Sequence, residues 1–251
     1  MSEPGHELRI PVADLALDGA VDFLRDAELE VLARMPYSSN ATFIAVARTE
    51  AIETAVIYKP MRGERPLWDF PDGTLFQREV ATHELSAALG WGVVPPTVER
   101  DGPFGLGMVQ LFVEHDADEH YFTLLERFAD RFRALAAFDV LANNADRKGG
   151  HCLHDVRRND VIGIDHGLTF HEEWKLRTVI WDFAGEPIAE TLLADIDRVR
   201  GELDGALGAA FEHRLSRGEL DALRDRADEL LAAGSYPIPE GDWRSVPYPL
   251  V

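Results

Sequence analysis

The chain has 251 residues, 46% of them hydrophobic and 28% charged, and its 45 acidic against 25 basic side chains give a formal net charge of −20. This length and composition are those of a globular protein with a sizeable core, built as one large domain or as two lobes, and we favour two lobes. An acidic surface repels phosphate backbones and anionic headgroups within about a Debye length, roughly 8 Å at physiological salt. We therefore expect neither a nucleic-acid partner nor stable membrane insertion.

Several features favour a cytoplasmic location. No apolar run approaches the roughly 20 residues that span a bilayer. Residues 1–6 lack the basic region and the apolar core of a signal peptide. The single cysteine, Cys152, rules out an internal disulfide framework, and we expect it to pack in the core. The oligomeric state stays open.

The first half of the chain predicts strands and one helix. Apolar and polar side chains alternate over residues 43–48 and 54–59, which predicts an antiparallel hairpin. Helical periodicity follows over residues 75–89 and ends at Gly90. A continuous apolar run over residues 105–114 then predicts a buried strand.

The second half of the chain is mostly helical, because leucine and other apolar residues recur there at helical spacing. In chain order we expect a helix over 121–142, a short buried strand over 162–164, a helix over 192–203, a helix opened by the capping box Ser216-Arg217-Gly218-Glu219, and an irregular proline-rich strap over 235–251.

Three residues with a distinctive spacing follow the predicted helix over 121–142. Protein kinases place a proton-accepting Asp five positions before a metal-binding Asn, and set a second metal-binding Asp in an Asp-x-Gly turn after a short hairpin. Asp146, His151 and Asp165 of Asp165-His166-Gly167 reproduce that spacing with one ligand substituted. The pattern predicts a phosphotransferase site, in which Asp146 is the general base and Asp165 binds a metal ion that bridges phosphate oxygens.

His151 stands where the spacing calls for an oxygen ligand. Magnesium prefers oxygen ligands, whereas imidazole suits manganese-like and transition ions better. We therefore expect Mg²⁺ or Mn²⁺, bound by His151 and Asp165. A purely structural hydrogen bond of His151 within its loop is the alternative.

An ATP phosphate tail also needs backbone donors and a cationic side chain. Lys59, at the end of the second predicted strand, has the position of a lysine that contacts phosphates, held by a glutamate on the following helix. Glu79 is the first choice for that glutamate, and Glu84 is its competitor. Before the first strand, Ser38-Ser39-Asn40 predicts a tight turn that covers phosphates, with an ordinary structural turn as the alternative.

Three short motifs resemble those of a known kinase family. Gln110-Leu111-Phe112-Val113-Glu114 is similar to the hinge of type II phosphatidylinositol 4-kinases. Asp146-Arg147 resembles the start of the catalytic loop, and Ile164-Asp165-His166-Gly167 resembles the metal-binding turn. By these motifs the chain resembles the phosphatidylinositol 3-/4-kinase-like group of atypical kinases, which includes HipA-type and secretory-pathway kinases, and looks like an actinobacterial branch of it. The resemblance covers about residues 38–170.

The resemblance implies an α+β, two-lobed atypical protein-kinase-like fold. A β-rich N-lobe would occupy residues 1–112 and a mainly helical C-lobe residues 113–251. ATP would be the cofactor, with Gln110 in the hinge and Phe112 and Val113 lining the adenine pocket. The family has Asn where His151 stands.

The acceptor is not defined by these motifs. The acidic composition favours a hydroxyl of a soluble protein or small molecule, with a phosphatidylinositol lipid as a further alternative. A pseudokinase that binds nucleotide without turnover, and nucleotidyl transfer to a protein, use the same motifs. A metal-dependent hydrolase is the alternative from another class, with candidate ligands His151, His154, Asp165, His166 and His171.

Overall fold

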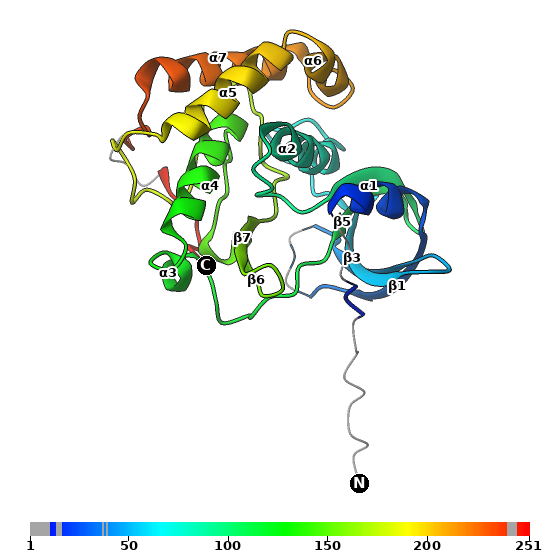
Figure 1. The fold of residues 1–251 in the computed structure, drawn as a ribbon. Coiled ribbons are helices and arrows are strands. Elements are labelled where there is room, and N and C mark those ends of the chain that lie inside the picture. The colour runs from blue at the N-terminus through cyan, green and yellow to red at the C-terminus, as the bar shows by residue number, and fades with distance from the viewer. Residues whose placement is uncertain (1–10, 14–16, 37, 39, 240–244) are drawn as a thin grey trace. The chain divides into compact units, whose positions relative to one another are not determined.

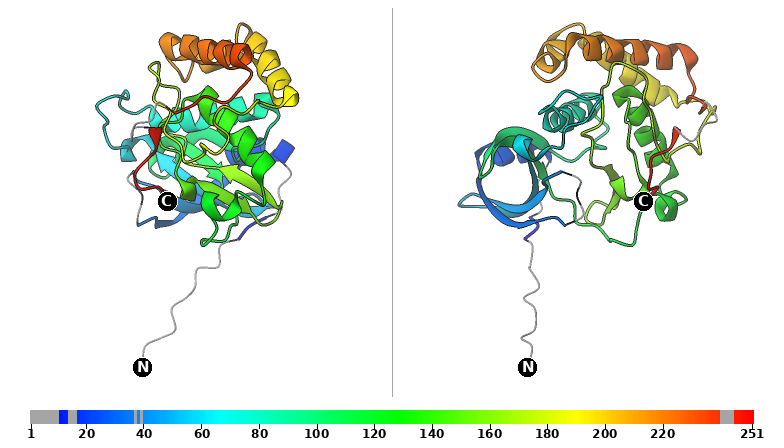
Figure 2. Two further views of the ribbon diagram at one scale, coloured as in Figure 1. Left: turned by 90° about the vertical axis from the view of Figure 1, so that its left-hand side faces the viewer. Right: turned by 180° about the vertical axis from the view of Figure 1, so that it is seen from behind.

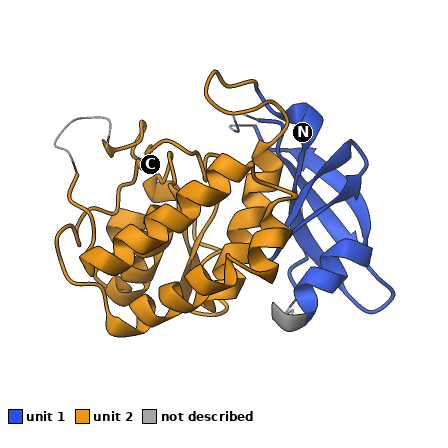
Figure 3. Ribbon diagram, turned by 90° about the horizontal axis from the view of Figure 1, so that it is seen from above, with its two compact units in different colours: residues 1–65, 96–112 blue, residues 66–95, 113–251 orange. Residues whose placement is uncertain are grey.

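The computed structural model describes residues 11–13, 17–36, 38, 40–239 and 245–251. The chain divides into two compact units (Figure 3). Unit 1 comprises Met1–Arg65 and Pro96–Phe112, and unit 2 comprises Pro66–Pro95 and Val113–Val251. Unit 1 is rich in strands and unit 2 is mainly helical, so the expected α+β class is confirmed. Residues 66–95, which we expected in the N-lobe, group with unit 2.

Unit 1 is a five-stranded antiparallel sheet with the order β1-β2-β3-β5-β4. The sheet curls strongly, and α1 packs against β4 and β5 (Figures 1 and 2). The predicted hairpin is confirmed, and the strand predicted over 105–114 ends at Leu111. The elements are α1 (Leu17–Asp26), β1 (Glu28–Arg34), β2 (Phe43–Arg48), β3 (Glu53–Pro60), the 3-10 turn η1 (Met61–Gly63), β4 (Thr97–Gly102) and β5 (Gly105–Leu111).

The helices of unit 2 pack around one hydrophobic core, and most residues of α4 are buried in it. Helices α5 and α7 lie side by side and contact one another (Figures 1 and 2). The elements are α2 (Leu75–Leu89), α3 (Tyr121–Leu124), α4 (Ala129–Ala142), the 3-10 turn η2 (Gly149–His151), the hairpin β6 (Cys152–Asp155) and β7 (Asp160–Gly163), α5 (Glu190–Glu202), α6 (Ala206–Phe211) and α7 (Arg217–Ala233).

Local signals located the ends of two helices correctly. Gly90 adopts a left-handed backbone (φ 73°) and ends α2, as predicted. Ser216 caps α7, and Glu219 completes the predicted capping box. The predicted continuous helix over 121–142 is wrong: α3 ends at Leu124, and α4 begins only at Ala129 because Phe128 leaves helical geometry (φ −128°, ψ 33°).

Candidate active site

The loop that carries Asp146 begins at the end of α4. Asn143 ends this helix in a left-handed conformation (φ 49°), which asparagine tolerates better than most residues. Asn144 then donates a side-chain hydrogen bond to Asp139 (3.0 Å) and accepts one from the backbone N–H of Asp146 (3.0 Å). Buried Asp139 and Asn144 thus fix the backbone from which Asp146 projects.

Arg147 is the central anchor of the site. Its guanidinium is fully buried and donates to both carboxylate oxygens of Asp139, at 2.9 to 3.2 Å. It also donates to the carbonyl oxygens of His151 (3.2 Å) and Ile164 (2.9 Å). Burial disfavours its charge, yet Asp139 outweighs that effect and holds the pKa of Arg147 above its usual value. One side chain therefore joins α4, the Asp146 loop and the Asp165 turn.

The Asp165 turn is held from two further sides. Arg147 donates to Nε2 of His166 (2.6 Å), and since arginine only donates, the proton of the neutral His166 ring lies on Nδ1. The backbone N–H of His166 donates to Oε2 of Glu79 on α2 (3.0 Å). Asp165 itself has a left-handed backbone (φ 59°), a costly conformation that tends to occur at functional sites.

His151 presents a lone pair to Asp165. Its Nδ1 lies 2.9 Å from the backbone oxygen of Asp146, and its Nε2 lies 3.4 Å from Oδ2 of Asp165. A carbonyl oxygen only accepts, so Nδ1 carries the proton. Burial lowers the pKa of His151, which favours the neutral ring with Nε2 unprotonated. Two acceptors at this separation repel each other unless a cation lies between them, and the pair therefore fits a metal ion.

Lys148 lies beside the candidate base. Its Nζ is 2.7 Å from Oδ2 of Asp146, and both side chains remain partly exposed. Because the pair is accessible to solvent, the lysine can release the aspartate to bind a phosphate, and the aspartate can release the lysine to bind a hydroxyl. Cys152, in contrast, is fully buried, and burial raises the pKa of its thiol to about 12, so it acts as a core residue.

The histidines expected for a hydrolase do not converge. His154 contacts Glu119 (2.5 Å), His166 accepts from Arg147, and His171 lies 2.9 Å from the backbone oxygen of Asp69. Within the described part of the chain, no group of three or more His, Cys, Asp or Glu side chains could hold a metal ion. A three-ligand zinc site of the hydrolase type is thus not supported, whereas a metal shared by two protein ligands and substrate phosphates needs no third side chain.

Unit 1 carries most of the residues expected to bind nucleotide. Lys59 is half-buried on β3, opposite Met108 of β5. Asn40 accepts a hydrogen bond from the backbone N–H of Arg65 (2.9 Å), and buried Gln110 donates to Thr97 (2.9 Å). Both side chains therefore also have structural partners within unit 1.

The remaining nucleotide candidates are distributed as follows. Ser38 lies 3.5 Å from the backbone oxygen of Met35, and Ser39 lies outside the described residues. The backbone N–H of Phe112 donates to Ala55 at the end of unit 1. Val113 begins unit 2, where it packs against the β6-β7 hairpin.

The two candidate glutamates, both on α2, have different partners. Glu84 forms a bidentate ion pair with Arg214, with distances of 2.8 and 2.9 Å. Glu79 instead contacts the turn after Asp165. Glu79 is therefore the glutamate that lies beside the candidate site within unit 2.

One contributor, Asp139, was missed in the sequence, and the pairing of another, Lys148, was not predicted. Asp139 is a buried acid among the apolar residues of α4, seven positions before Asp146. A charged residue in such a segment indicates a buried partner, and this signal was available. Lys148 was visible only as one basic residue among several near the motifs, and its pairing with Asp146 depends on how the loop folds.

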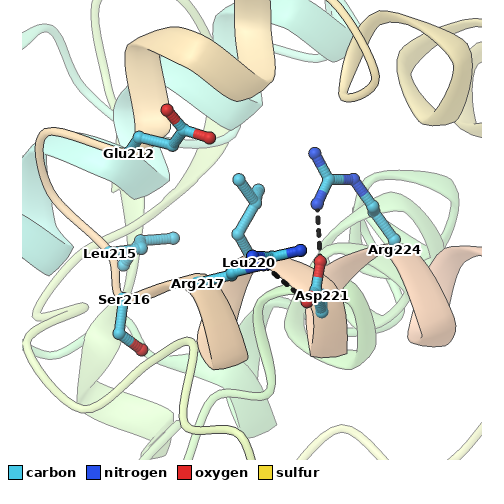
Figure 4. Close-up of a pocket in the computed structure, with 7 residues that line it drawn as sticks. All are labelled: Glu212, Leu215, Ser216, Arg217, Leu220, Asp221 and Arg224. Atoms are coloured by element: carbon cyan, nitrogen blue, oxygen red, sulfur yellow. Dashed lines mark hydrogen bonds and ion pairs between the residues drawn. The ribbon is translucent and has the colours of Figure 1, made fainter.

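A separate cavity of about 510 Å³ lies between the end of α6 and the start of α7 (Figure 4). Arg224 and Asp221, which line it, form an ion pair of 2.8 Å. None of the candidate site residues lines this cavity, so it is distinct from the site described above. Its lining residues are Glu212, Leu215, Ser216, Arg217, Leu220, Asp221 and Arg224.

Across the described residues, no helix has the length and apolar character required to cross a membrane.

The comparison with solved structures shows the fold. The Golgi casein kinase with Mn/ADP bound is 12% identical, with a TM-score of 0.56 over 86% of this chain and 75% of that one. The Helicobacter pylori proinflammatory kinase CtkA is 11% identical, with a TM-score of 0.52 over 82% and 92%. A hydra Fam20 structure with sugar is 12% identical, with a TM-score of 0.53 over 88% of each chain.

Sequence comparison reaches a closer relative. Protein Rv2133c of Mycobacterium tuberculosis (strain ATCC 25618 / H37Rv) is 41% identical over 261 residues, covering 90% of this chain and 93% of that protein. The family model "Phosphatidylinositol 3- and 4-kinase" matches residues 88–192, a range that contains Asp146, His151 and Asp165. The chain belongs to the phosphatidylinositol 3-/4-kinase-like family of atypical kinases.

Proposed function

We propose that the protein transfers the γ-phosphate of ATP to a hydroxyl group of a soluble protein or small molecule, with Mg²⁺ or Mn²⁺. The observation that carries the proposal is the distance of 3.4 Å between Nε2 of His151 and Oδ2 of Asp165. This pair is suited to a divalent cation, which neutralises charge on the phosphate oxygens during phosphoryl transfer. The Mn/ADP-bound state of a kinase with the same fold supports the assignment.

Asp146 is the proposed base. The acceptor hydroxyl oxygen forms a bond to the γ-phosphorus as the bond between this phosphorus and the bridging oxygen of ADP breaks, and the hydroxyl proton passes to Asp146. Lys148, 2.7 Å from Asp146, restricts the orientation of that carboxylate and brings positive charge to the phosphate. The buried bonds of Arg147 hold both loops in register, so they act by positioning.

The nucleotide-binding roles are proposed for residues of both units. Lys59 of β3 contacts the phosphates, and Glu79 supports the metal-binding turn and the lysine. Residues 38–40 cover the phosphate tail, and the hinge segment from Gln110 to Val113 lines the adenine site. A soluble acceptor fits the net charge of −20, which opposes approach to an anionic membrane.

Nucleotide binding and turnover test the proposal separately. Asp165→Asn is expected to lose Mn²⁺-dependent ATP binding by calorimetry. Asp146→Asn is expected to retain that binding and to lose ATP turnover by about 10²- to 10⁴-fold. Asp197→Asn, at an exposed position on α5, is the matched control and is expected to change neither.

Two results would contradict the proposal in different ways. ATP binding that is unaffected by Asp165→Asn removes the assigned metal site. The unsubstituted protein is a pseudokinase if it binds ATP but shows no turnover with a panel of protein and small-molecule hydroxyls. The presence of His151 where the family has Asn is the reason to test for this outcome.

A further inference from the structure

Two tryptophans of unit 2 expose unusually large apolar surfaces. Trp68 is 93% exposed and Trp174 is 50% exposed. An indole left in water does little for the fold, and exposed apolar side chains that lie together commonly mark an interaction site. Trp68 precedes α2, and Trp174 follows the Asp165 turn by nine residues.

The two segments that carry these indoles are joined. Lys175 forms an ion pair with Asp69 (2.6 Å), and its Nζ lies 5.0 Å from the centre of the Trp68 ring. His171 lies 2.9 Å from the backbone oxygen of Asp69 and contacts Phe70 edge-on, with ring centres 5.3 Å apart. The two segments therefore form one surface, which we call the tryptophan surface (residues 67–72 and 171–175).

The tryptophan surface is bonded directly to the loop of the candidate base. The Asn143 side chain donates to the backbone oxygen of Glu173 (2.7 Å) and accepts from the backbone N–H of Lys175 (2.8 Å), on either side of Trp174. Asn143 is buried and lies three residues before Asp146. A partner bound at the tryptophan surface is thus held beside the candidate catalytic loop.

Buried arginines hold the same segment in place. Arg78 donates to the backbone oxygen of Thr169 (2.6 Å), and Arg226 donates to that of His171 (3.3 Å). A backbone held in this way loses little conformational freedom on binding, which favours affinity.

The charges of the tryptophan surface select the partner. Lys175 over the Trp68 ring shows that this indole already accepts a cation at one face. Exposed carboxylates of Asp72, Glu172 and Glu173 lie on the same two segments, and the chain as a whole carries a net charge of −20. Aromatic faces flanked by carboxylates complement lysine and arginine side chains.

We propose that the tryptophan surface binds a basic peptide segment that carries the acceptor hydroxyl. The inference rests on the proposed function and narrows its acceptor to a protein with lysine or arginine near the phosphorylated residue. Indole faces take the cationic side chains, and Glu173 and Asp72 attract them over a longer range.

Binding is measured first without catalysis. A fluorescein-labelled peptide of lysine, serine and glycine is titrated into Asp146→Asn protein, and a peptide with glutamate in place of lysine is the control. The lysine peptide is expected to bind, and its affinity is expected to fall when salt is added. Trp68→Ala with Trp174→Ala is expected to reduce its affinity about tenfold, and Glu173→Gln to reduce it less. Ile238→Ala, which removes an exposed apolar side chain outside the surface, is expected to change nothing.

Catalysis is measured second, with the lysine peptide as acceptor. The double tryptophan variant is expected to raise the KM for peptide about tenfold, with kcat and the KM for ATP unchanged. Equal binding by the double variant and the unsubstituted surface overturns the proposal. So does preference for the glutamate peptide, or tryptophan-dependent binding to phosphatidylcholine vesicles with or without phosphatidylserine, which identifies a membrane surface instead.

The two assays separate this inference from the proposed function. Tryptophan-dependent peptide binding without phosphate transfer by the unsubstituted protein supports the docking surface and contradicts the kinase activity. If the protein transfers phosphate to the lysine peptide and substitution of Trp68 and Trp174 does not change this transfer, the result supports the activity and contradicts the docking surface.

Discussion

At the scale of single residues, the candidate site depends on one buried ion pair. Arg147 and Asp139 are both inaccessible to solvent, and each uses several hydrogen bonds to compensate for its burial. Such a pair contributes little compared with a well-packed apolar pair, but removal of one partner leaves the other charged and buried. The pair therefore makes the site intolerant of single substitutions.

Arg147→Met is expected to lower the free energy of unfolding by about 3–5 kcal/mol, because the Asp139 carboxylate loses its buried partner. Urea denaturation measures the change. Arg200→Met, which disrupts ion pairs with the exposed acids Asp204 and Asp228, is the control and is expected to cost about 1 kcal/mol or less. Equal costs for the two variants would contradict the central role of Arg147. A second replacement, Asp139→Leu, is expected to recover part of the loss.

His151 is expected to determine the choice of metal. An imidazole nitrogen is a better ligand for Mn²⁺ than for Mg²⁺, whereas an asparagine oxygen suits Mg²⁺. In His151→Asn, the ratio of ATP affinity in Mn²⁺ to that in Mg²⁺ is expected to fall by about tenfold, as a change near a metal commonly does. Calorimetric titration of ATP in each metal measures the ratio. An unchanged ratio would show that His151 is not a ligand, and the exposed His213→Asn controls for the loss of an imidazole.

The sequence predicted which residues form the candidate site better than it predicted their hydrogen-bond partners. Spacing alone brought Asp146, His151 and Asp165 into one hypothesis, because a short hairpin returns the chain to the same place. A hydrogen bond of His151 within its loop was the alternative, and His151 does bond the Asp146 carbonyl. The identity of this partner could not be predicted, since the contact depends on the turn at Gly149–His151. The roles of these residues in catalysis stay predictions.

At the scale of elements, local signals worked where a residue acts on its own backbone. Gly90 and Ser216 end and begin helices through conformations or hydrogen bonds within a few residues, so their positions could be predicted. The break between α3 and α4 could not. Backbone hydrogen bonds of helical spacing lie on both sides of Phe128, and the Phe128 ring packs against His154 of β6. The apolar period of the sequence carries no information about a contact this distant in the chain.

Gly107 of β5 is required by a close approach between strands. A side chain at this position would collide with the backbone of Lys59 and Pro60 on β3. Gly107→Ala is therefore expected to destabilise unit 1 by about 1–3 kcal/mol and to weaken ATP binding through the displaced Lys59 strand.

Thermal unfolding and ATP titration of the same variant measure both effects. Gly201→Ala is the matched control, because the space around this glycine of α5 is open. It is expected to be neutral or to stabilise by up to about 1 kcal/mol. A Gly107→Ala protein as stable as the unsubstituted chain would contradict the close approach of β3 and β5.

At the scale of the whole molecule, the excess of acidic side chains opposes the compact state. Like charges repel in the folded chain, and the repulsion is screened by salt. The ion pairs of the surface, such as Arg198 with Glu202 at 3.0 Å, are weakened by the same screening, but exposed pairs of this kind contribute little. Repulsion is therefore expected to dominate the response to salt.

The midpoint of thermal unfolding is accordingly expected to rise when sodium chloride is added at low ionic strength. A stabilisation of about 1 kcal/mol corresponds to about 2–4 °C for a chain of this size. A variant with the exposed acids Asp118, Glu126 and Asp197 replaced by their amides is expected to start from a higher midpoint and to gain less from salt, because part of the repulsion is already removed. A midpoint that falls with salt would mean that attractive pairs outweigh repulsion, and it would also weaken the case that charge steers a basic acceptor toward this protein.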